Sequence, residues 1–474
     1  MGILSAIMAD TKAKQEVECP RCAALEARVA ALEAQLAKAQ KHSGNSSKPP
    51  SSDLVKPPKK QQKRGRPKKR KIGGQPGHAR HLRTPLAPEE LDRHWVWAYD
   101  ECPCCGGRLV PADEPPHVLQ QIELHDLPVQ IEQHDRQPQW CGRCERTFVP
   151  TFPAELAKAG LVGPRLTALV GFLKGACHMS FSSIRKYFRD VIGVQISRGM
   201  LGKLVGKVSA SLADPYEALV AMLPDEDRLN IDETGHKENG QRLWTWCFRA
   251  YLYTVYKISP SRGSDVLLAV LGKEFDGIVG CDYFSAYRKY MKLNENVLLQ
   301  FCLAHFIRDV KFLVEHPQAA NVRYGELLLS HLRKLFGVIH RREQFASEVS
   351  FRKTLTAVRN SLVSAAILEL PNTREAGNLA DRFVDHYESY FRFVTEPNVE
   401  PTNNLAEQAI RFVAIHRRIT QGTRSEDGRR WCERIWTVIQ TCNQQKRSVF
   451  EFLFAAVKAH FQSEPAPSLA PNSS

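Results

Sequence analysis

Two aspartates stand where short apolar stretches give way to polar residues. Asp232 follows Leu229–Ile231 and Asp282 follows the stretch GIVGC, and both stretches read as buried strands. Glu233 does not compete with Asp232, because neighbouring side chains of a strand point to opposite faces. Carboxylates at the ends of adjacent strands can hold a pair of divalent cations about 3.5 to 4 Å apart, which assists in-line displacement at phosphorus. Phosphodiester cutting or joining is therefore one chemistry that these residues could support.

A third carboxylate would have to come from a helix that crosses behind the strands. Asn404, Glu407 and Arg411 fall at i, i+3 and i+7 of a predicted helix and share one of its faces. Glu400 precedes a proline in the loop before that helix and is the weaker alternative. Taken alone, each aspartate also fits a turn or a helix cap, Glu407 fits a solvated helix face, and Arg411 fits a structural ion pair as well as a phosphate contact.

Cysteine pairs point to a second kind of site. Cys102 and Cys105 form one Cys-x-x-Cys pair, and Cys141 and Cys144 form another after 35 intervening residues. Two such pairs supply four thiolates that can reach one tetrahedral Zn²⁺. We expect these four residues to hold a structural zinc ion on strands formed by the run HVLQQIELHDLPVQIEQH, with Cys104 as a bystander or substitute ligand. A set of free thiols is the alternative.

A strongly basic segment lies near the N-terminus. From position 41 to position 85 there are 14 lysines and arginines and one acid, within a chain whose net charge is +15. This density predicts contact with a polyanion, most often nucleic acid, although a solubilising linker or an anionic lipid contact would also fit. The candidate DNA-binding residues here, which could follow a phosphate backbone or enter a narrow minor groove, are Lys63, Arg64, Arg66, Lys68, Lys69, Arg70 and Lys71.

The segment before this basic region has the pattern of a short coiled coil. Leu25, Val29, Leu32 and Leu36 recur at spacings of four, three and four. Two heptads make a marginal coiled coil on their own. Self-association is therefore one interpretation, and a single amphipathic helix that docks on its own domain is the other.

Between about 163 and 212 the pattern is helical and is interrupted at Gly193. Ser197 is a plausible N-cap for a second helix that contains Met200, Leu201, Leu204 and Val205. Two helices joined by a short glycine-containing turn form the outline of a helix-turn-helix, and also of an ordinary helical hairpin. In the first case the second helix would present Arg198 and Lys203 to a major groove.

The pattern from 228 to 290 is that of strands. A strand carrying Asp232 is followed by LWTWCF and YLYTVYKI, by a helix in SDVLLAVLG, and by the strand that leads to Asp282. This order is the opening of a ribonuclease-H-like fold. Residues from about 300 to 395 read as largely helical, so the 124 residues between Asp282 and Glu407 predict an inserted helical subdomain.

Six segments in this order resemble the insertion sequence 66 family of transposases. They are NSSKPPSSD at 45, GGQPGH at 73, CPCCGG at 102, IDET at 231, CDYFSAY at 281 and PTNNLAEQAIR at 401. The resemblance spans nearly the whole chain. It implies a DNA transposase with an Asp-Asp-Glu site on a ribonuclease-H-like domain, in which Asp232, Asp282 and Glu407 are the three carboxylates.

The resemblance also implies cofactors and partners. Two Mg²⁺ or Mn²⁺ ions per site would serve hydrolysis at the element ends, and the 3′ hydroxyls thus freed would attack target DNA in the same site, without a covalent protein intermediate. The terminal inverted repeats and the target are then the DNA partners, a homodimer or higher oligomer would pair two ends, and small accessory proteins of the same element are further candidates. Gln408 departs from the arginine that often follows the glutamate in this family, and His305 matches a Cys-x-x-His segment whose default role is helix packing.

Composition limits the other classes. Hydrophobic residues make up 43% of the 474, which excludes wholesale disorder. No run approaches the roughly 18 apolar residues of a membrane span, and the N-terminus does not resemble a secretory signal. No P-loop and no His-Glu-x-x-His motif is present, which argues against an ATP-driven helicase and a metalloprotease. We expect a cytoplasmic protein of a bacterium, associated with the nucleoid, with no membrane partner. A non-catalytic, zinc-containing DNA-binding regulator is the alternative function.

The predicted fold class is a multidomain α+β protein with a coiled-coil helix, a zinc-binding module, a helical DNA-binding region and a ribonuclease-H-like core that carries a helical insertion. The expected boundaries are 1–42 for the N-terminal helix, 43–99 for a basic flexible linker, 100–150 for the zinc module, 151–225 for the DNA-binding region, 226–295 and 396–446 for the catalytic core, 296–395 for the insertion, and 447–474 for a C-terminal helix and disordered tail.

Overall fold

The structure is a computed structural model that describes residues 20–46, 87–90, 104–106, 108, 129–136, 138–141, 143 and 145–471. The chain divides into two compact units. The first comprises Met1–Pro57, Asp135–Asp190 and Val194–Ser474, and the second comprises Pro58–His134 and Val191–Gly193. The predicted DNA-binding arm at 63–71 lies outside the described residues.

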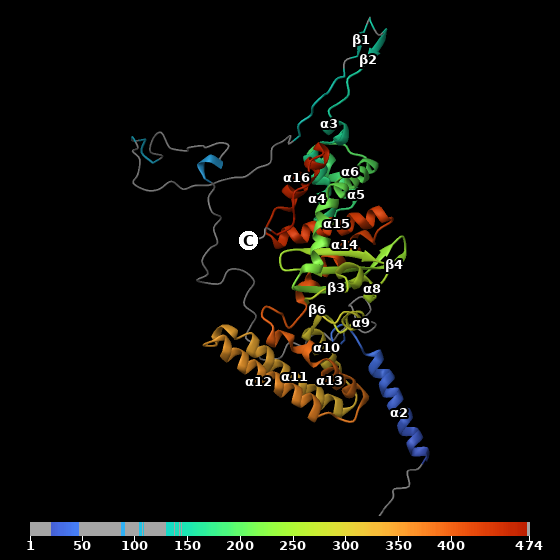
Figure 1. Cartoon of the computed structure of the whole chain (residues 1–474), viewed down its shortest axis with the longest axis vertical. Helices are drawn as coiled ribbons and strands as arrows, with labels where there is room; N and C mark the ends of the chain where they lie inside the picture. The colour runs from blue at the N-terminus through green and yellow to red at the C-terminus, as the bar shows by residue number, and fades with distance from the viewer. Residues whose placement is uncertain are drawn as a thin grey trace, which may run out of the picture. The chain divides into compact units, whose positions relative to one another are not determined.

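A five-stranded mixed sheet forms the centre of the first unit (Figure 1). Its strands are β3 (Arg228–Glu238), β4 (Gln241–Arg249), β5 (Thr254–Ser259), β6 (Ile278–Cys281) and β7 (Leu298–Phe301), in the spatial order β5-β4-β3-β6-β7. β3, β4 and β5 pair antiparallel as consecutive hairpins, whereas β6 runs parallel to both β3 and β7. The chain is thus a mixed α+β protein, as the sequence predicts.

Two details of this sheet differ from the sequence prediction. β3 does not end at Asp232 but continues six residues further, to Glu238, because its second half pairs with β4 as an antiparallel hairpin. β7 was not predicted, since its four residues stand directly before a long helical stretch and are too few to show a period. Helices α8 (Ser264–Leu271) and α9 (Ser285–Leu293) make the connections from β5 to β6 and from β6 to β7.

Helix α15 (Glu426–Gln444) protects the edge strand β5. Glu433, Thr437 and Thr441 follow one another at intervals of four along the helix. Their side-chain oxygens accept the backbone N–H groups of Ile258 at 2.7 Å, Tyr256 at 3.0 Å and Thr254 at 3.2 Å, respectively. Unpaired N–H groups along an edge strand can pair with another chain. Here all three of these N–H groups have acceptors on α15.

Helices precede the sheet in the chain. They are α3 (Ala154–Ala159), α4 (Pro164–Gly175), α5 (Phe181–Tyr187), the π-helix η3 (Phe188–Ile192), α6 (Arg198–Ser211), α7 (Ala213–Met222) and the short 3-10 helix η4 (Leu223–Asp225). The Ser197 hydroxyl accepts the Met200 N–H and caps α6, as predicted. Leu201, Leu204 and Val205 are buried, so this face of α6 is packed against the fold.

Among the described residues, one stretch is long and apolar enough to cross a membrane, namely Ala154–Gly175. The stretch is divided between α3 and α4, and six of the twelve residues of α4 are buried within the protein. Core helices pass the same test of length and composition, so this stretch is weak evidence for a membrane span.

Four long helices separate β7 from the helix that carries Glu407. They are α10 (Leu303–Val314), α11 (Ala319–Ile339), α12 (Glu348–Leu368) and α13 (Arg374–Thr395), with the short η5 (Arg342–Gln344) between α11 and α12. Consecutive helices pack on one another, and α13 also packs on β7 (Figure 1). The helical content predicted for 300–395 is therefore present.

The C-terminal part of the chain packs on the helices that precede the sheet. α14 (Asn404–Thr420) lies against β3 and β4, and α16 (Val449–Gln462) packs on α4 and α6. The tail beyond α16 continues as an ordered segment to residue 471. Leu469 is buried, and the carbonyl groups of Ser468 and Leu469 accept hydrogen bonds from Arg447 and Gln445. These contacts argue against the disorder expected for this tail, whose last three residues lie outside the described ones.

The N-terminal helix α2 (Pro20–Ala39) forms as predicted. Its four seam residues keep more than half of their surface exposed, between 51% for Leu36 and 57% for Leu25. The loop after α2 is anchored, since Asn45 donates a hydrogen bond of 2.6 Å to Glu315 and His42 lies 3.5 Å from the same carboxylate. The seam itself is therefore not covered by any described part of the chain.

Strands β1 (Gln139–Cys141) and β2 (Arg146–Phe148) form a short antiparallel hairpin. The second predicted cysteine pair thus begins at the end of β1. Residues 129–136, at the end of the run expected to form strands, have no regular secondary structure, and 117–128 lie outside the described residues. In the second unit the described part contains the 3-10 helix η2 (Pro88–Glu90) and the exposed Cys104 and Cys105.

Candidate metal centre

Asp232 lies on β3, and Asp282 directly follows the neighbouring parallel strand β6. Arg228, Leu229 and Asn230 of β3 pair with Ile278, Val279 and Gly280 of β6. Two residues beyond the last pair, Asp232 lies within β3 and Asp282 lies directly after the end of β6. Both aspartates keep part of their surface open to solvent. The sheet thus brings together two residues that 49 others separate in the chain.

The two carboxylates share an unfavourable electrostatic environment. Burial raises the pKa of Asp232 well above its usual value, and the charges of Glu233, Asp282 and Glu407 raise it further. Burial, followed by the charge of Glu233, raises the pKa of Asp282 to about 7. Each carboxylate accepts one backbone N–H at 2.9 Å, from Glu233 and Phe284.

No lysine, arginine or histidine in the described part of the chain lies within ion-pair distance of Asp232 or Asp282. Crowded carboxylates without a cationic partner are the donor set that hard divalent cations take. The residues present therefore fit a magnesium or manganese site.

Glu407 reaches the same neighbourhood from the first turn of α14. Asn403, four residues before Glu407, holds that turn in place. Its side-chain amide donates to the Ile231 carbonyl at 2.7 Å and accepts from Asn230 at 2.9 Å, so it binds the helix start to the strand beside Asp232. Asn403 itself is buried. The loop residue Glu400, the alternative third carboxylate, is exposed.

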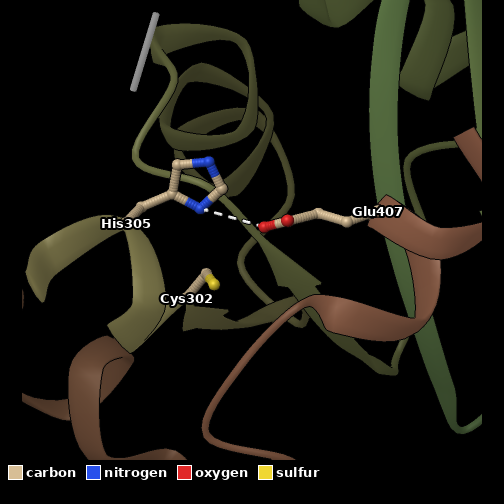
Figure 2. A group of neighbouring side chains, drawn as sticks. All are labelled: Cys302, His305 and Glu407. Carbon is tan, nitrogen blue, oxygen red and sulfur yellow. Dashed lines mark ion pairs between the residues drawn. The ribbon is translucent and has the colours of Figure 1, made fainter. Parts of the chain in front are cut away.

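The carboxylate of Glu407 faces α10 rather than open solvent, and its side chain is 16% exposed. Oε2 lies 3.5 Å from Nη2 of Arg308, and Oε1 lies 3.5 Å from Nδ1 of His305. Figure 2 shows His305 and Cys302 side by side opposite Glu407. Ligand atoms of Cys302, His305 and Glu407 all lie within 4.8 Å of one another, whereas the three predicted carboxylates do not form such a group.

Glu233, next to Asp232 in the chain, is committed to structural contacts. Its carboxylate accepts the Tyr287 hydroxyl at 2.6 Å and pairs with Arg262 at 2.7 Å, and its side chain is 1% exposed. Arg262 in turn stacks on the Phe284 ring, 3.9 Å from its centroid. Glu233 therefore contributes charge to the site but has its own partners.

The predicted DNA contacts Arg198, Lys203 and Arg411 are all exposed. Arg411 and Lys203 are exposed, and neither forms an ion pair with a described residue. Arg198 donates a hydrogen bond to Ser182 of α5. Of the predicted zinc ligands, Cys102 and Cys144 lie outside the described residues, Cys105 is exposed, and only the backbone of Cys141 is described, in β1. The zinc module stays a prediction.

Three residues of the site were not predicted from the sequence. Asn403 is the third residue of the segment PTNN at 401–404. A buried side-chain amide that links a helix start to a strand leaves no periodic pattern in the sequence. Cys302 was not singled out, and His305 was assigned to helix packing by default. The spacing Cys302-x-x-His305 was the available signal, since it places two metal-binding side chains on one turn of a helix.

The fold and the site together define a mixed α+β protein with neighbouring carboxylates at its central sheet. A family model described as the IS66 family of transposases matches residues 159–430, and a family of unknown function matches residues 9–84. The first match covers more than half of the chain. The chain therefore belongs to the IS66 transposase family, whose members' activity implies DNA binding and divalent metal ions.

Three relatives come from Sinorhizobium fredii (strain NBRC 101917 / NGR234). The uncharacterized protein y4qI is 24% identical over 70% of this chain and 66% of its own length. The uncharacterized proteins y4hP and y4jD are 24% and 25% identical, over 77% and 70% of this chain and 71% and 69% of their own lengths. The chain thus spans about two thirds of the length of these relatives.

Proposed function

We propose that this protein is the transposase of an insertion sequence, and that it cuts and joins DNA with two divalent cations held by Asp232, Asp282 and Glu407. The observation that carries the proposal is the parallel pairing of β3, which holds Asp232, with β6, which directly precedes Asp282, in a chain of a transposase family. The order of strands and helices around them is also the one expected for a ribonuclease-H-like domain.

Electrostatics support the assignment of these three residues. The charges of Asp282 and Glu407 both raise the pKa of Asp232, so a cation beside Asp232 would offset repulsion from both. When bound, Mg²⁺ or Mn²⁺ would supply charge neutralisation at the phosphoryl oxygens and activate the attacking oxygen. The protein's own contribution is to hold the carboxylates in place, through the β3–β6 register and through Asn403.

DNA would be held by the basic surfaces predicted from the sequence. Arg411 lies on α14 four residues after Glu407 and is exposed, so it can reach a phosphate next to the centre. The α5–α6 pair has the outline of a helix-turn-helix with the exposed Lys203 on its second helix. The basic arm at 63–71 would add contacts that depend steeply on salt.

A second copy of the chain is the partner proposed for α2. The exposed seam has Val29 at heptad position a, with Leu25 and Leu32 at d, a pattern that favours two parallel helices. Arg28 at g and Glu33 at the following e carry opposite charges and would pair across such a dimer. A dimer would bring two element ends together, so that both are cut in register.

The test is an end-cleavage and strand-transfer assay on duplexes taken from the DNA that flanks the gene. Asp232→Asn, Asp282→Asn and Glu407→Gln should each abolish Mg²⁺-dependent cutting and joining while DNA binding persists. Glu400→Gln, in the exposed loop before α14, is the matched control and should retain activity. Unchanged function in all three variants would instead indicate a DNA-binding regulator.

A further inference from the structure

Cys302, His305 and Glu407 form a compact group that the two-cation site does not explain. Cys302 is the N-cap residue of α10 and His305 lies one turn further on, while Glu407 comes from the first turn of α14. Figure 2 shows the imidazole and the carboxylate facing each other, with Cys302 next to them. A thiol, an imidazole and a carboxylate within 4.8 Å are three quarters of a tetrahedral ligand set.

Backbone contacts hold the two helix starts together without any ion. The Leu303 N–H donates to the Pro401 carbonyl at 2.9 Å, and the Asn403 N–H donates to Sγ of Cys302 at 3.1 Å. These contacts hold the sulfur at the junction of the two helix starts.

Two buried polar atoms in this group lack partners. Nδ1 of His305 and Oε1 of Glu407 are both inaccessible to solvent and have no hydrogen-bond partner in the described part of the chain, although they lie 3.5 Å apart. An unsatisfied buried polar atom costs about 1 to 3 kcal/mol. Nδ1 and Oε1 meet only each other, and a bound cation would satisfy both atoms.

We propose that Cys302, His305 and Glu407 bind a borderline-soft divalent cation of the Zn²⁺ class, with the fourth position left to water or a DNA phosphate. Thiolate and imidazole ligands select this class over Mg²⁺, which takes oxygen ligands. The ion ties the start of α10 to the start of α14. Binding itself does not depend on the proposed transposase activity, which enters only through the shared Glu407.

The test is the zinc content of the full-length protein, measured by mass spectrometry after exhaustive dialysis. Cys302→Ser and His305→Gln should each lose about one equivalent per chain relative to the wild type. Cys177→Ser, at an exposed cysteine outside the group, is the matched control and should lose none. Equal zinc content in the wild type and both variants overturns the proposal.

Cobalt substitution guards against variants that fail to fold. The wild type loaded with Co²⁺ should show a sulfur-to-cobalt charge-transfer band that is weaker in Cys302→Ser but retained in Asp232→Asn. Retention in Asp232→Asn, together with loss of its DNA cutting, separates this centre from the two-cation site. A Co²⁺ spectrum identical in the wild type and in a folded Cys302→Ser protein rules the centre out.

Discussion

A buried glutamate of α15 and two half-buried aspartates, all at the same sheet, differ in the partners that their charges have. At the β5 edge, Glu433 accepts the Ile258 N–H at 2.7 Å and pairs with Arg430 at 3.1 Å. The charge of Glu233 acts on both Asp232 of β3 and Asp282 just after β6, and neither has a cation of the described chain within ion-pair distance. Glu433 thus has both a hydrogen-bond donor and a cationic partner within the protein, whereas the two aspartates lack a cationic partner among the described residues.

This difference separates a structural role from a binding role. A buried carboxylate with a backbone donor and an arginine stabilises the fold, and its loss leaves partners unpaired. A group of carboxylates that repel one another costs stability and is explained when a cation joins it. The two groups should therefore respond in opposite ways to the same kind of substitution.

The largest effect should be on activity, from Glu407→Gln. The amide keeps the shape of the side chain but removes the charge, and several kcal/mol of metal-dependent stabilisation correspond to a loss of about a thousandfold or more in the rate of strand cutting. Glu407 is only 16% exposed and lies 3.5 Å from both Arg308 and His305, so the free energy of unfolding should also fall, by about 1 kcal/mol. A Glu407→Gln protein that cuts DNA at the wild-type rate would remove this residue from the site.

Glu433→Ala should give the largest loss of stability. It leaves the Ile258 N–H and the Arg430 guanidinium without their acceptor, which costs about 2 to 4 kcal/mol in the free energy of unfolding. Urea unfolding measures this cost. Glu426→Ala is the control, because Glu426 is on the same helix with its side chain 64% exposed, and its pairs with arginines are worth little.

Asn403→Ala should affect both the strand-cutting activity and the free energy of unfolding, each to an intermediate degree. It removes the bonds to Ile231 and Asn230, at about 1 to 3 kcal/mol of stability, and it frees the helix start that carries Glu407. The Mn²⁺ concentration needed for half-maximal cutting should rise, because the third carboxylate is no longer fixed. A change in stability without any shift in the Mn²⁺ dependence would assign Asn403 to the fold alone.

The smallest effect is a dependence of stability on pH. Asp282 has a folded pKa of about 7 and an unfolded value of about 3.9, so the folded state binds more protons between these values and gains stability as the pH falls. Asp282→Asn removes this titration. In metal-free buffer the variant should be more stable than the wild type by about 1 to 3 kcal/mol at pH 8, and the difference should disappear toward pH 4.

Asp276→Asn is the control for this pH dependence, because Asp276 is exposed before the same strand, and the variant should follow the wild type throughout. A variant Asp282→Asn that is less stable than the wild type at pH 8 would show that the carboxylate is favourably bound within the protein. The comparison with Glu433 would then fail.

Much of the fold was predictable because the sequence carries periodic patterns. Alternating and apolar runs located β3, β4, β5 and β6, and the helix cap at Ser197 was identified by residue type. β7 and the continuation of β3 beyond Asp232 were missed, since pairing with neighbours determines them and not local pattern. The contacts of the tail at Leu469 likewise arise from tertiary packing.

The site was predictable only in part. Asp232, Asp282 and Glu407 were selected by strand position, by helix spacing and by resemblance, but their spatial relation depends on the parallel register of β3 and β6. The link through Asn403 and the group formed with Cys302 depend on how the start of α14 meets the start of α10, roughly a hundred residues away in the chain. No local sequence pattern predicts that the starts of α10 and α14 lie together.

The most direct test is the position of Mn²⁺ in crystals of the full-length protein, located by anomalous diffraction. Two manganese ions should lie between the carboxylates of Asp232, Asp282 and Glu407, with oxygen ligands at about 2.2 Å and a separation of about 3.5 to 4 Å. Saturating Mn²⁺ that leaves Asp232 and Asp282 without a bound ion would contradict the account.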